Sequence, residues 1–462
     1  MRIFRTLLLC LLPVLATGCA SLTGRDLIEP YSQQMAPMRQ DLAKGQLQAA
    51  IDSIKPGSPR DTSYYLKQLE LGRLQFLSGH FKSSQQHFKR VADHIQWLES
   101  QAKYRLSNGL QNSVSVVTND SARSYRIPVY EQVMLHHYEA LNYLHQHNLT
   151  GAMVEIRKAE LLQQNIAYRQ SWHLGQLESQ YQGQVKSVLD QYPSMQALIS
   201  QSKNQYQNAY TYLLSAALYQ AVGQPNDAYI DYKKALSISP DNQQIGAITA
   251  ELADRLDMPA KERLNRRFKA LEQKPGQGLL IILYEQNLIP YRRQIALRLP
   301  VSINHHFQFL SVAFPVLTQD PKPSPPLILQ IGEHRLESTI AAQLQSLAAW
   351  HLKEQLPMMI LRQLIRLSGK TVFADQLSRQ NPLLGLLATA YNTITEHADT
   401  RSWESLPASA QFAIGSFKAG SYKVRLSGAR DGLLPLKIRE NKVTLVVIGD
   451  LGHSFTSQVF LL

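Results

Sequence analysis

The sequence predicts an α+β protein, in which an N-terminal α-helical solenoid is followed by a C-terminal β-sandwich with an inserted helical hairpin. Residues 29–273 are poor in proline and glycine and carry apolar residues at helical spacing. Residues 278–462 contain short apolar runs of period two, which is typical of strands. Between about residues 337 and 397 the helical spacing returns, with strand-like segments on both sides. These flanking strands favour one C-terminal domain with an insertion over two separate domains.

The chain begins with the pattern of a bacterial export signal. Two arginines precede a short apolar run that ends in small residues, and this run is too short to span a bilayer. The segment Leu15-Ala16-Thr17-Gly18-Cys19 resembles the lipobox of bacterial lipoproteins. The resemblance implies cleavage after residue 18, lipidation of Cys19 and attachment to a membrane through that lipid. The alternative is an ordinary signal peptide followed by a chance cysteine.

The residues after Cys19 imply a location. Residues 19–28 would form a lipidated tether, and Ala20 stands where an aspartate would alter sorting in related lipoproteins. We therefore expect an outer-membrane protein that faces the periplasm. The other cysteine, Cys10, lies in the leader, so the mature chain is expected to have neither a disulfide nor a cysteine-based metal site. No cofactor is expected.

The chain is basic, with a formal net charge of +13. Such a balance favours anionic partners, and peptidoglycan is one candidate in the envelope. Export argues against nucleic acid. The simpler interpretation is a solubilising surface charge without a specific partner, because no run of five Lys or Arg residues is present.

A pattern of small and aromatic residues recurs in the helical half. A small residue at the centre of one helix is followed by a turn residue, and then by an aromatic or other apolar residue and further small residues on a second helix. The three copies are Leu71, Gly72, Gly79, Phe81, Ser84, Phe88 and Val91; Ala140, Tyr143, Leu149, Ala152, Ile156 and Ala159; and Ala216, Tyr219, Gly223, Ala228, Tyr232, Ala235 and Pro240. This pattern resembles a tetratricopeptide (TPR) repeat, which implies stacked helix pairs with a concave binding surface.

The other elements follow in order. Residues 29–54 read as a partial helix pair, and residues 106–130 as a long loop that interrupts the array. Residues 155–207 are expected to form extended, glutamine-rich helices with a break near Pro193. Strands are expected at residues 279–284, 295–301, 307–314, 327–331, 411–417, 421–427, 434–439 and 442–448. In the inserted hairpin, Pro357 should kink or restart the first helix.

One segment beside the second repeat concentrates functional side chains. The candidate partner-binding residues are Asn119, Asp120, Arg123, Tyr125, Tyr130, Glu131 and His136. The segment resembles a signature of a little-characterised family of TPR-containing bacterial outer-membrane lipoproteins. The resemblance implies a role in the envelope and no assigned enzyme activity. The structural alternative is that the aspartate and the arginine tie the loop to a helix end.

A second family-like signature contains Asp399, Arg401 and Trp403. These residues form a second candidate partner-binding patch. The alternative is structural, with an Asp–Arg pair that caps a helix and a tryptophan packed over it. The histidines near residue 140 lack the spacing of a zinc site, so no metal is expected.

Two functions remain open at this stage. The first is a lipoprotein that acts without catalysis as a periplasmic scaffold, binding an envelope protein partner. The second is an enzyme acting on peptidoglycan, for which Asp120, Glu131 and His136 are the acid–base candidates. An open cleft that brings these side chains together would favour the enzyme.

Overall fold

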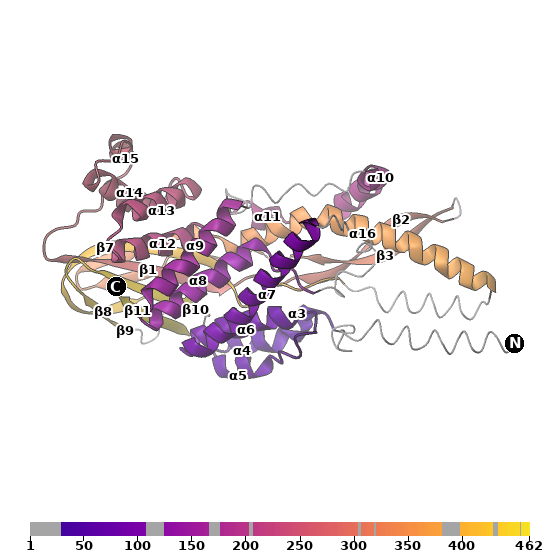
Figure 1. Cartoon of the computed structure of the whole chain (residues 1–462), viewed down its shortest axis with the longest axis horizontal. Helices are drawn as coiled ribbons and strands as arrows, with labels where there is room; N and C mark the ends of the chain where they lie inside the picture. Colours follow the sequence, from indigo (N-terminus) through magenta and orange to yellow (C-terminus); the bar gives the residue numbers. More distant parts are fainter. Residues whose placement is uncertain are drawn as a thin grey trace.

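The computed structural model shows a mixed α+β architecture, as the sequence predicts, with helices in the N-terminal part and sheets in the C-terminal part (Figure 1). The structure describes residues 29–107, 124–165, 176–202, 207–303, 306–317, 320–380, 398–427, 433–452 and 454–462. The leader, Cys19, the tether, and the candidate residues Asn119, Asp120 and Arg123 lie outside these ranges.

The helical part consists mainly of helices joined in consecutive pairs. Its elements are α3 (Tyr31–Gln34), α4 (Ala36–Ala43), α5 (Leu47–Ser53), α6 (Tyr64–Leu77), α7 (Phe81–Ser107), α8 (Val129–His145), α9 (Leu149–Asn165), α10 (Gln176–Gln191), α11 (Gln196–Ile199), α12 (Ala209–Ala221), α13 (Pro225–Ile238), α14 (Gln243–Arg255) and α15 (Lys261–Arg267). The three predicted repeats coincide with the pairs α6–α7, α8–α9 and α12–α13. The predicted partial pair at residues 29–54 corresponds to α4 and α5.

The repeat pattern has a direct physical basis in these pairs. At Gly72 an added Cβ would lie 2.6 Å from the Phe88 ring, so only glycine allows this close approach of α6 and α7. The turn after α6 uses Gly79 with a φ of 77°, in the left-handed region that favours glycine. Ala228 is fully buried against the paired helix α12, as a small contact residue should be.

Two sheets and a ribbon form the C-terminal part. Its strands are β1 (Gln277–Leu288), β2 (Arg293–Ile303), β3 (His306–Val316), β4 (Ile328–Ile331), β5 (His334–Glu337), β6 (Thr339–Ala342), β7 (Pro407–Lys418), β8 (Gly420–Leu426), β9 (Leu433–Ile438), β10 (Val443–Asp450) and β11 (Phe455–Leu461). One sheet has the order β11-β10-β1-β7-β6, the other the order β5-β4-β8-β9, and β2 and β3 form a two-stranded ribbon. Strand β1 pairs with β10 in parallel and with β7 in antiparallel orientation.

The five-stranded sheet has an apolar layer on each face. Because side chains alternate along β1, Ile281 and Leu283 pack into a cluster with the helices, whereas Ile282 packs into a cluster with the four-stranded sheet. Helices, first sheet and second sheet therefore form successive layers. The proposed domain boundary between residues 273 and 278 stays a prediction, and a continuous apolar cluster extends across it.

The predicted helical insertion differs from the structure at its start. Residues expected to begin the helix instead form β5 and β6, and Ile340 is exposed on β6. Helix α16 (Leu344–Gln380) continues through Pro357 without restarting, and the second helix of the hairpin falls at residues 381–397, outside the described part. Strand β11 was not predicted.

Of the helices that the structure describes, none has the length and apolarity needed to cross a bilayer.

Candidate functional site

The segment that leads into α8 is held against the loop before α6. The Tyr125 backbone N–H donates to the Thr62 carbonyl oxygen at 3.1 Å. Pro128 then has an extended backbone and directly precedes α8. Proline suits this position because it fixes φ and helices commonly begin beside it. The tyrosine is buried, whereas Ser124 and Arg126 are exposed.

Glu131 joins the two sequence signatures. Its Oε1 accepts hydrogen bonds from the Tyr125 hydroxyl at 2.8 Å, the Tyr130 hydroxyl at 3.0 Å and the Trp403 backbone N–H at 3.1 Å. The side chain is fully buried, and burial raises its pKa although these hydrogen bonds oppose the shift. Glu131 therefore anchors residues 124–131 to the segment around Trp403.

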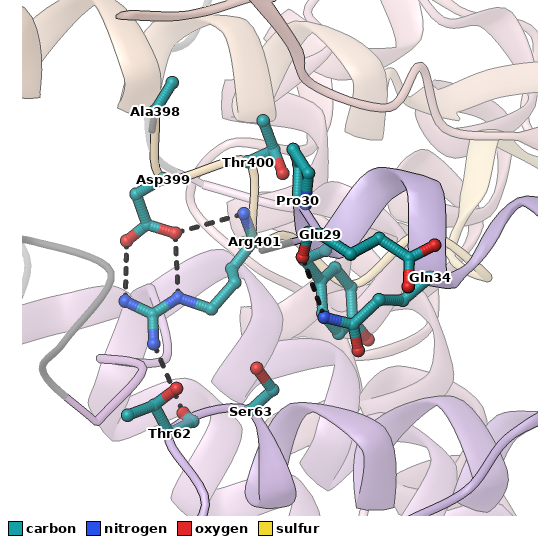
Figure 2. A pocket seen from close by; sticks show the side chains of 10 residues that line it. Glu29, Pro30, Gln34, Thr62, Ser63, Ala398, Asp399, Thr400 and Arg401 are labelled. Carbon is teal, nitrogen blue, oxygen red and sulfur yellow. Dashed lines mark hydrogen bonds and ion pairs between the residues drawn. The ribbon is translucent and has the colours of Figure 1, made fainter. Parts of the chain in front are cut away.

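Asp399 and Arg401 form a bidentate ion pair (Figure 2). Arg401 Nε and Nη2 each donate to a separate Asp399 oxygen at 2.7 Å, and Nη1 donates to the Thr62 carbonyl oxygen at 3.2 Å. Burial would raise the pKa of Asp399, but Arg401 outweighs it and lowers the pKa, so the aspartate is ionised. The Arg401 guanidinium also lies 5.7 Å from the centre of the Tyr125 ring. The two predicted patches therefore meet at Thr62.

Trp403 lies beneath this junction rather than on its surface. It is fully buried, lies 5.8 Å from Phe88 and 6.0 Å from Tyr138 between ring centres, and donates from Nε1 to the Ser405 hydroxyl at 2.9 Å. A side chain in this position contributes to core packing. The structural interpretation of Trp403 accounts for all of these contacts.

His136 is separate from the junction. Its Nδ1 lies 2.6 Å from Glu155 Oε2 on the next helix, and Lys158 bonds the other oxygen of that carboxylate at 2.7 Å. Burial would raise the pKa of Glu155, but these hydrogen bonds lower it. Glu131 and His136 therefore have separate partners. These contacts do not bring the two side chains together, and Asp120 lies outside the described residues.

A second buried carboxylate supports the same segment. Glu70 accepts the backbone N–H groups of Glu404 and Ser405 at 2.7 and 2.9 Å, and also the Tyr31 hydroxyl at 3.3 Å. Burial raises the pKa of Glu70 to about 8. Arg39 pairs with Glu404 nearby. Glu70 was not among the residues predicted from the sequence, because nothing in a helical segment indicates that one glutamate will accept hydrogen bonds from backbone N–H groups far away in the chain.

A cavity of about 170 Å³ lies beside the Asp399–Arg401 pair. It is bounded by the segment before α8, the turn between β1 and β2, helix α16 and residues 399–401. Four arginines line it: Arg126, Arg292, Arg362 and Arg401. Asp399 is the only carboxylate in the lining among the described residues. The site is therefore strongly positive.

Arg292 is the unusual member of this group. It is 3% exposed, yet its guanidinium makes no hydrogen bond or ion pair with another described residue. Burial alone would lower its pKa, but the nearby Tyr125, Tyr130, Asp399 and Glu131 raise it on balance, so the group is a cation. His351 on α16 is neutral, because burial and then Arg292 lower its pKa to about 3.

Arg292 was likewise not predicted from the sequence. The signal that points to it is its position, since it follows a buried strand and Pro290 as the first of two consecutive arginines. No cluster of three or more metal-ligating side chains occurs among the residues that the structure describes.

Comparison with known proteins gives only distant likenesses. No protein-family model and no curated protein matches the chain. Two crystal structures of MamA align with TM-scores of 0.28 and 0.29, at 11% identity, over 50% and 54% of this chain and 89% and 90% of theirs. A tetratricopeptide repeat protein from Parabacteroides merdae aligns with a TM-score of 0.15, at 14% identity, over 51% of this chain and 93% of its own. Likenesses at these scores indicate no function.

Proposed function

We propose that this chain is a lipid-anchored outer-membrane protein that binds an envelope protein partner on its periplasmic side, as a scaffold without catalytic activity. The observation that carries the proposal is the junction at Thr62, where two signatures remote in sequence meet around one cavity. Buried carboxylates accept hydrogen bonds from the backbone beneath this junction, and two exposed residues, Ser124 and Arg126, lie at its edge.

The arrangement suits binding better than acid–base chemistry. Glu131 is fully buried beneath the junction, and His136 is engaged with Glu155 on the paired helix α9. A general acid or base needs to reach the group whose proton it moves. The junction instead offers positive charge and a preformed hollow, both of which are suited to holding part of another molecule.

The partner-binding site can be tested by photo-crosslinking in intact cells. A photoreactive amino acid at Arg126 should give discrete higher-mass adducts, because this residue lines the cavity and is exposed. The matched control is Lys437, which is exposed on β9 in the four-stranded sheet. Identical adducts at both positions, or none at Arg126, would count against a binding site at the junction.

The anchor is proposed from the sequence of residues 15–19. Cys19→Ser removes the thiol that would carry the lipid, so the variant should remain an unacylated precursor. Palmitate labelling followed by membrane fractionation measures this outcome. Labelling that persists in the variant would refute lipidation at Cys19.

A further inference from the structure

We infer that the cavity beside Arg292 binds the carboxylate of an organic anion, whose carbon stem lies against Met358 and Met359. The preference for a carboxylate is inferred from the residues that line the cavity. The expected source of that carboxylate, an acidic side chain or the chain end of a protein partner, rests on the proposed scaffold function.

The first argument is the state of the buried cation. Transferring an arginine from water is costly unless its charge is paired and its N–H groups are hydrogen-bonded. Arg292 is 3% exposed, lines the cavity and has no such pair among the described residues. A ligand oxygen in the cavity would supply the missing partner, and carboxylates match the planar fork of a guanidinium.

The second argument is the charge already present around the cavity. Asp399 neutralises Arg401 through two hydrogen bonds, and Arg362 has interactions of its own. Arg292 therefore contributes a buried positive charge that no described carboxylate pairs with directly. Asp399 remains in the lining and would repel a doubly charged ligand. A singly charged group such as a carboxylate fits this balance better than a phosphate dianion.

The third argument is the size and lining of the hollow. A single water molecule needs a cavity volume of roughly 10–15 Å³, whereas this cavity has a volume of about 170 Å³. A lone inorganic ion would leave most of it unfilled. Pro128, Met358 and Met359 supply apolar surface on the lining, and methionine adapts to irregular ligands. A carboxylate on a short apolar stem uses both parts of the site.

The test uses three probes on the purified chain without its leader. N-acetyl-leucine carries a carboxylate on an apolar stem, N-acetyl-leucinamide is its neutral counterpart, and inorganic phosphate is the competing oxyanion. Ligand-observed NMR should detect N-acetyl-leucine binding at millimolar concentration and little binding of the amide. Equal binding of the acid and the amide would overturn the inference, and tighter binding of phosphate would overturn its assignment to a carboxylate.

Arg292→Met should weaken N-acetyl-leucine binding by about tenfold or more, because it removes a charged hydrogen-bond donor at similar size. Arg293→Met is the matched control, since Arg293 is the next residue, is exposed and lies outside the cavity lining. Binding that survives Arg292→Met unchanged would overturn the inference.

A second pair of variants covers the case in which Arg292→Met does not fold. Met358→Glu places a carboxylate in the cavity and should block N-acetyl-leucine, whereas Met358→Gln should leave most of the binding. Equal effects of the two would contradict a role for charge.

The same measurements separate this inference from the proposed function. If N-acetyl-leucine binds through Arg292 but Arg126 gives no crosslink in cells, the carboxylate site stands and the scaffold proposal fails. If crosslinks form and Arg292→Met leaves them intact, a partner binds at the junction without using this site.

Discussion

Two arginines are buried almost equally in this molecule, but their surroundings differ. Arg73 on α6 is 1% exposed, and its Nη2 lies 3.0 Å from Glu285 Oε2 on β1. Its Nε also donates to the Tyr138 hydroxyl at 2.9 Å. Arg292 is 3% exposed and has neither an ion pair nor a hydrogen bond of this kind among the described residues. One cation is enclosed by the core, and the other opens onto a cavity.

This difference distinguishes a buried charge that stabilises the fold from one that is available to bind a ligand. Glu285 has several partners besides Arg73, since it also accepts hydrogen bonds from the Tyr138 hydroxyl at 2.8 Å and the Tyr210 hydroxyl at 3.4 Å. This network joins helices α6, α8 and α12 to strand β1, so it fixes how the helical layer sits on the sheet. Among the described residues, no comparable network surrounds Arg292, and a ligand in the adjacent cavity can supply the partner that it lacks there.

The largest expected effect is at the enclosed pair. Glu285→Gln leaves Arg73 buried without a counter-charge, and breaking one side of a buried pair costs about 3–5 kcal/mol of stability. Urea or thermal unfolding of the purified chain measures this loss. The control is Glu337→Gln, which breaks an exposed pair with Arg335 and should cost about 0–1 kcal/mol. Similar small losses in both variants would mean that the Arg73 network does not hold the layers together.

A smaller effect concerns Glu139, a buried carboxylate that forms no ion pair with another described residue although Lys158 and Lys89 act on it. Glu139 on α8 is 4% exposed, and burial, together with Glu155, raises its pKa to about 8. Between its ordinary pKa near 4.5 and this value, the folded state binds the proton more readily than the unfolded state. Its contribution to stability is therefore present at acidic pH and is lost as pH rises toward 8.

Glu139→Gln should remove this pH dependence. The variant should match the wild type near pH 5 and be more stable by about 1–3 kcal/mol near pH 8, as judged from chemical unfolding. Glu70 and Glu160 have pKa values raised to about 8 as well, so the difference between wild type and variant is the informative quantity. Glu262→Gln, at an exposed position on α15, should leave the pH profile unchanged. A variant that is less stable at pH 8 would show that Glu139 is ionised and paired there.

The sequence predicted those features that depend on local spacing. Gly72 and Phe88 lie close because a small residue on one helix lets an aromatic residue on the next approach, and this relation repeats along the chain. The alternation along β1 likewise follows from the strand period, because its two faces contact different layers. The predicted start of the helical insertion was wrong because the spacing of Ile340, Leu344 and Leu347 suits both a helix and a strand followed by a helix.

The candidate site was only partly predictable for a different reason. Tyr125, Asp399 and Arg401 were recognised within compact sequence signatures, and the fold brings them together. Pairing across long separations leaves no local pattern. Neither the Arg73–Glu285 pair nor the lack of a described partner for Arg292 could therefore be inferred from spacing. Both depend on how the helical layer and α16 are placed over the sheets.

The smallest expected effect on stability completes the comparison. Arg292→Met removes a buried charge that has no partner among the described residues, and it puts an apolar side chain of similar length beside Met358 and Met359. Asp399 keeps its two hydrogen bonds from Arg401, so no carboxylate loses a direct partner. We expect the unfolding free energy to change by less than about 1 kcal/mol, or to rise, because replacing a buried charge by apolar groups is often neutral or stabilising.

Arg73→Met is the counterpart of this change and should behave oppositely, because it leaves Glu285 buried without its cation. A loss of about 3–5 kcal/mol is expected there, measured under the same unfolding conditions. Both substitutions replace a buried arginine by methionine, so the changes in side-chain size and hydrophobicity are the same in the two variants. If Arg292→Met were as damaging as Arg73→Met, Arg292 would be holding the fold together, and its open side would not be a binding feature. A near-neutral result would show that the fold does not need this charge, which leaves ligand binding as its role.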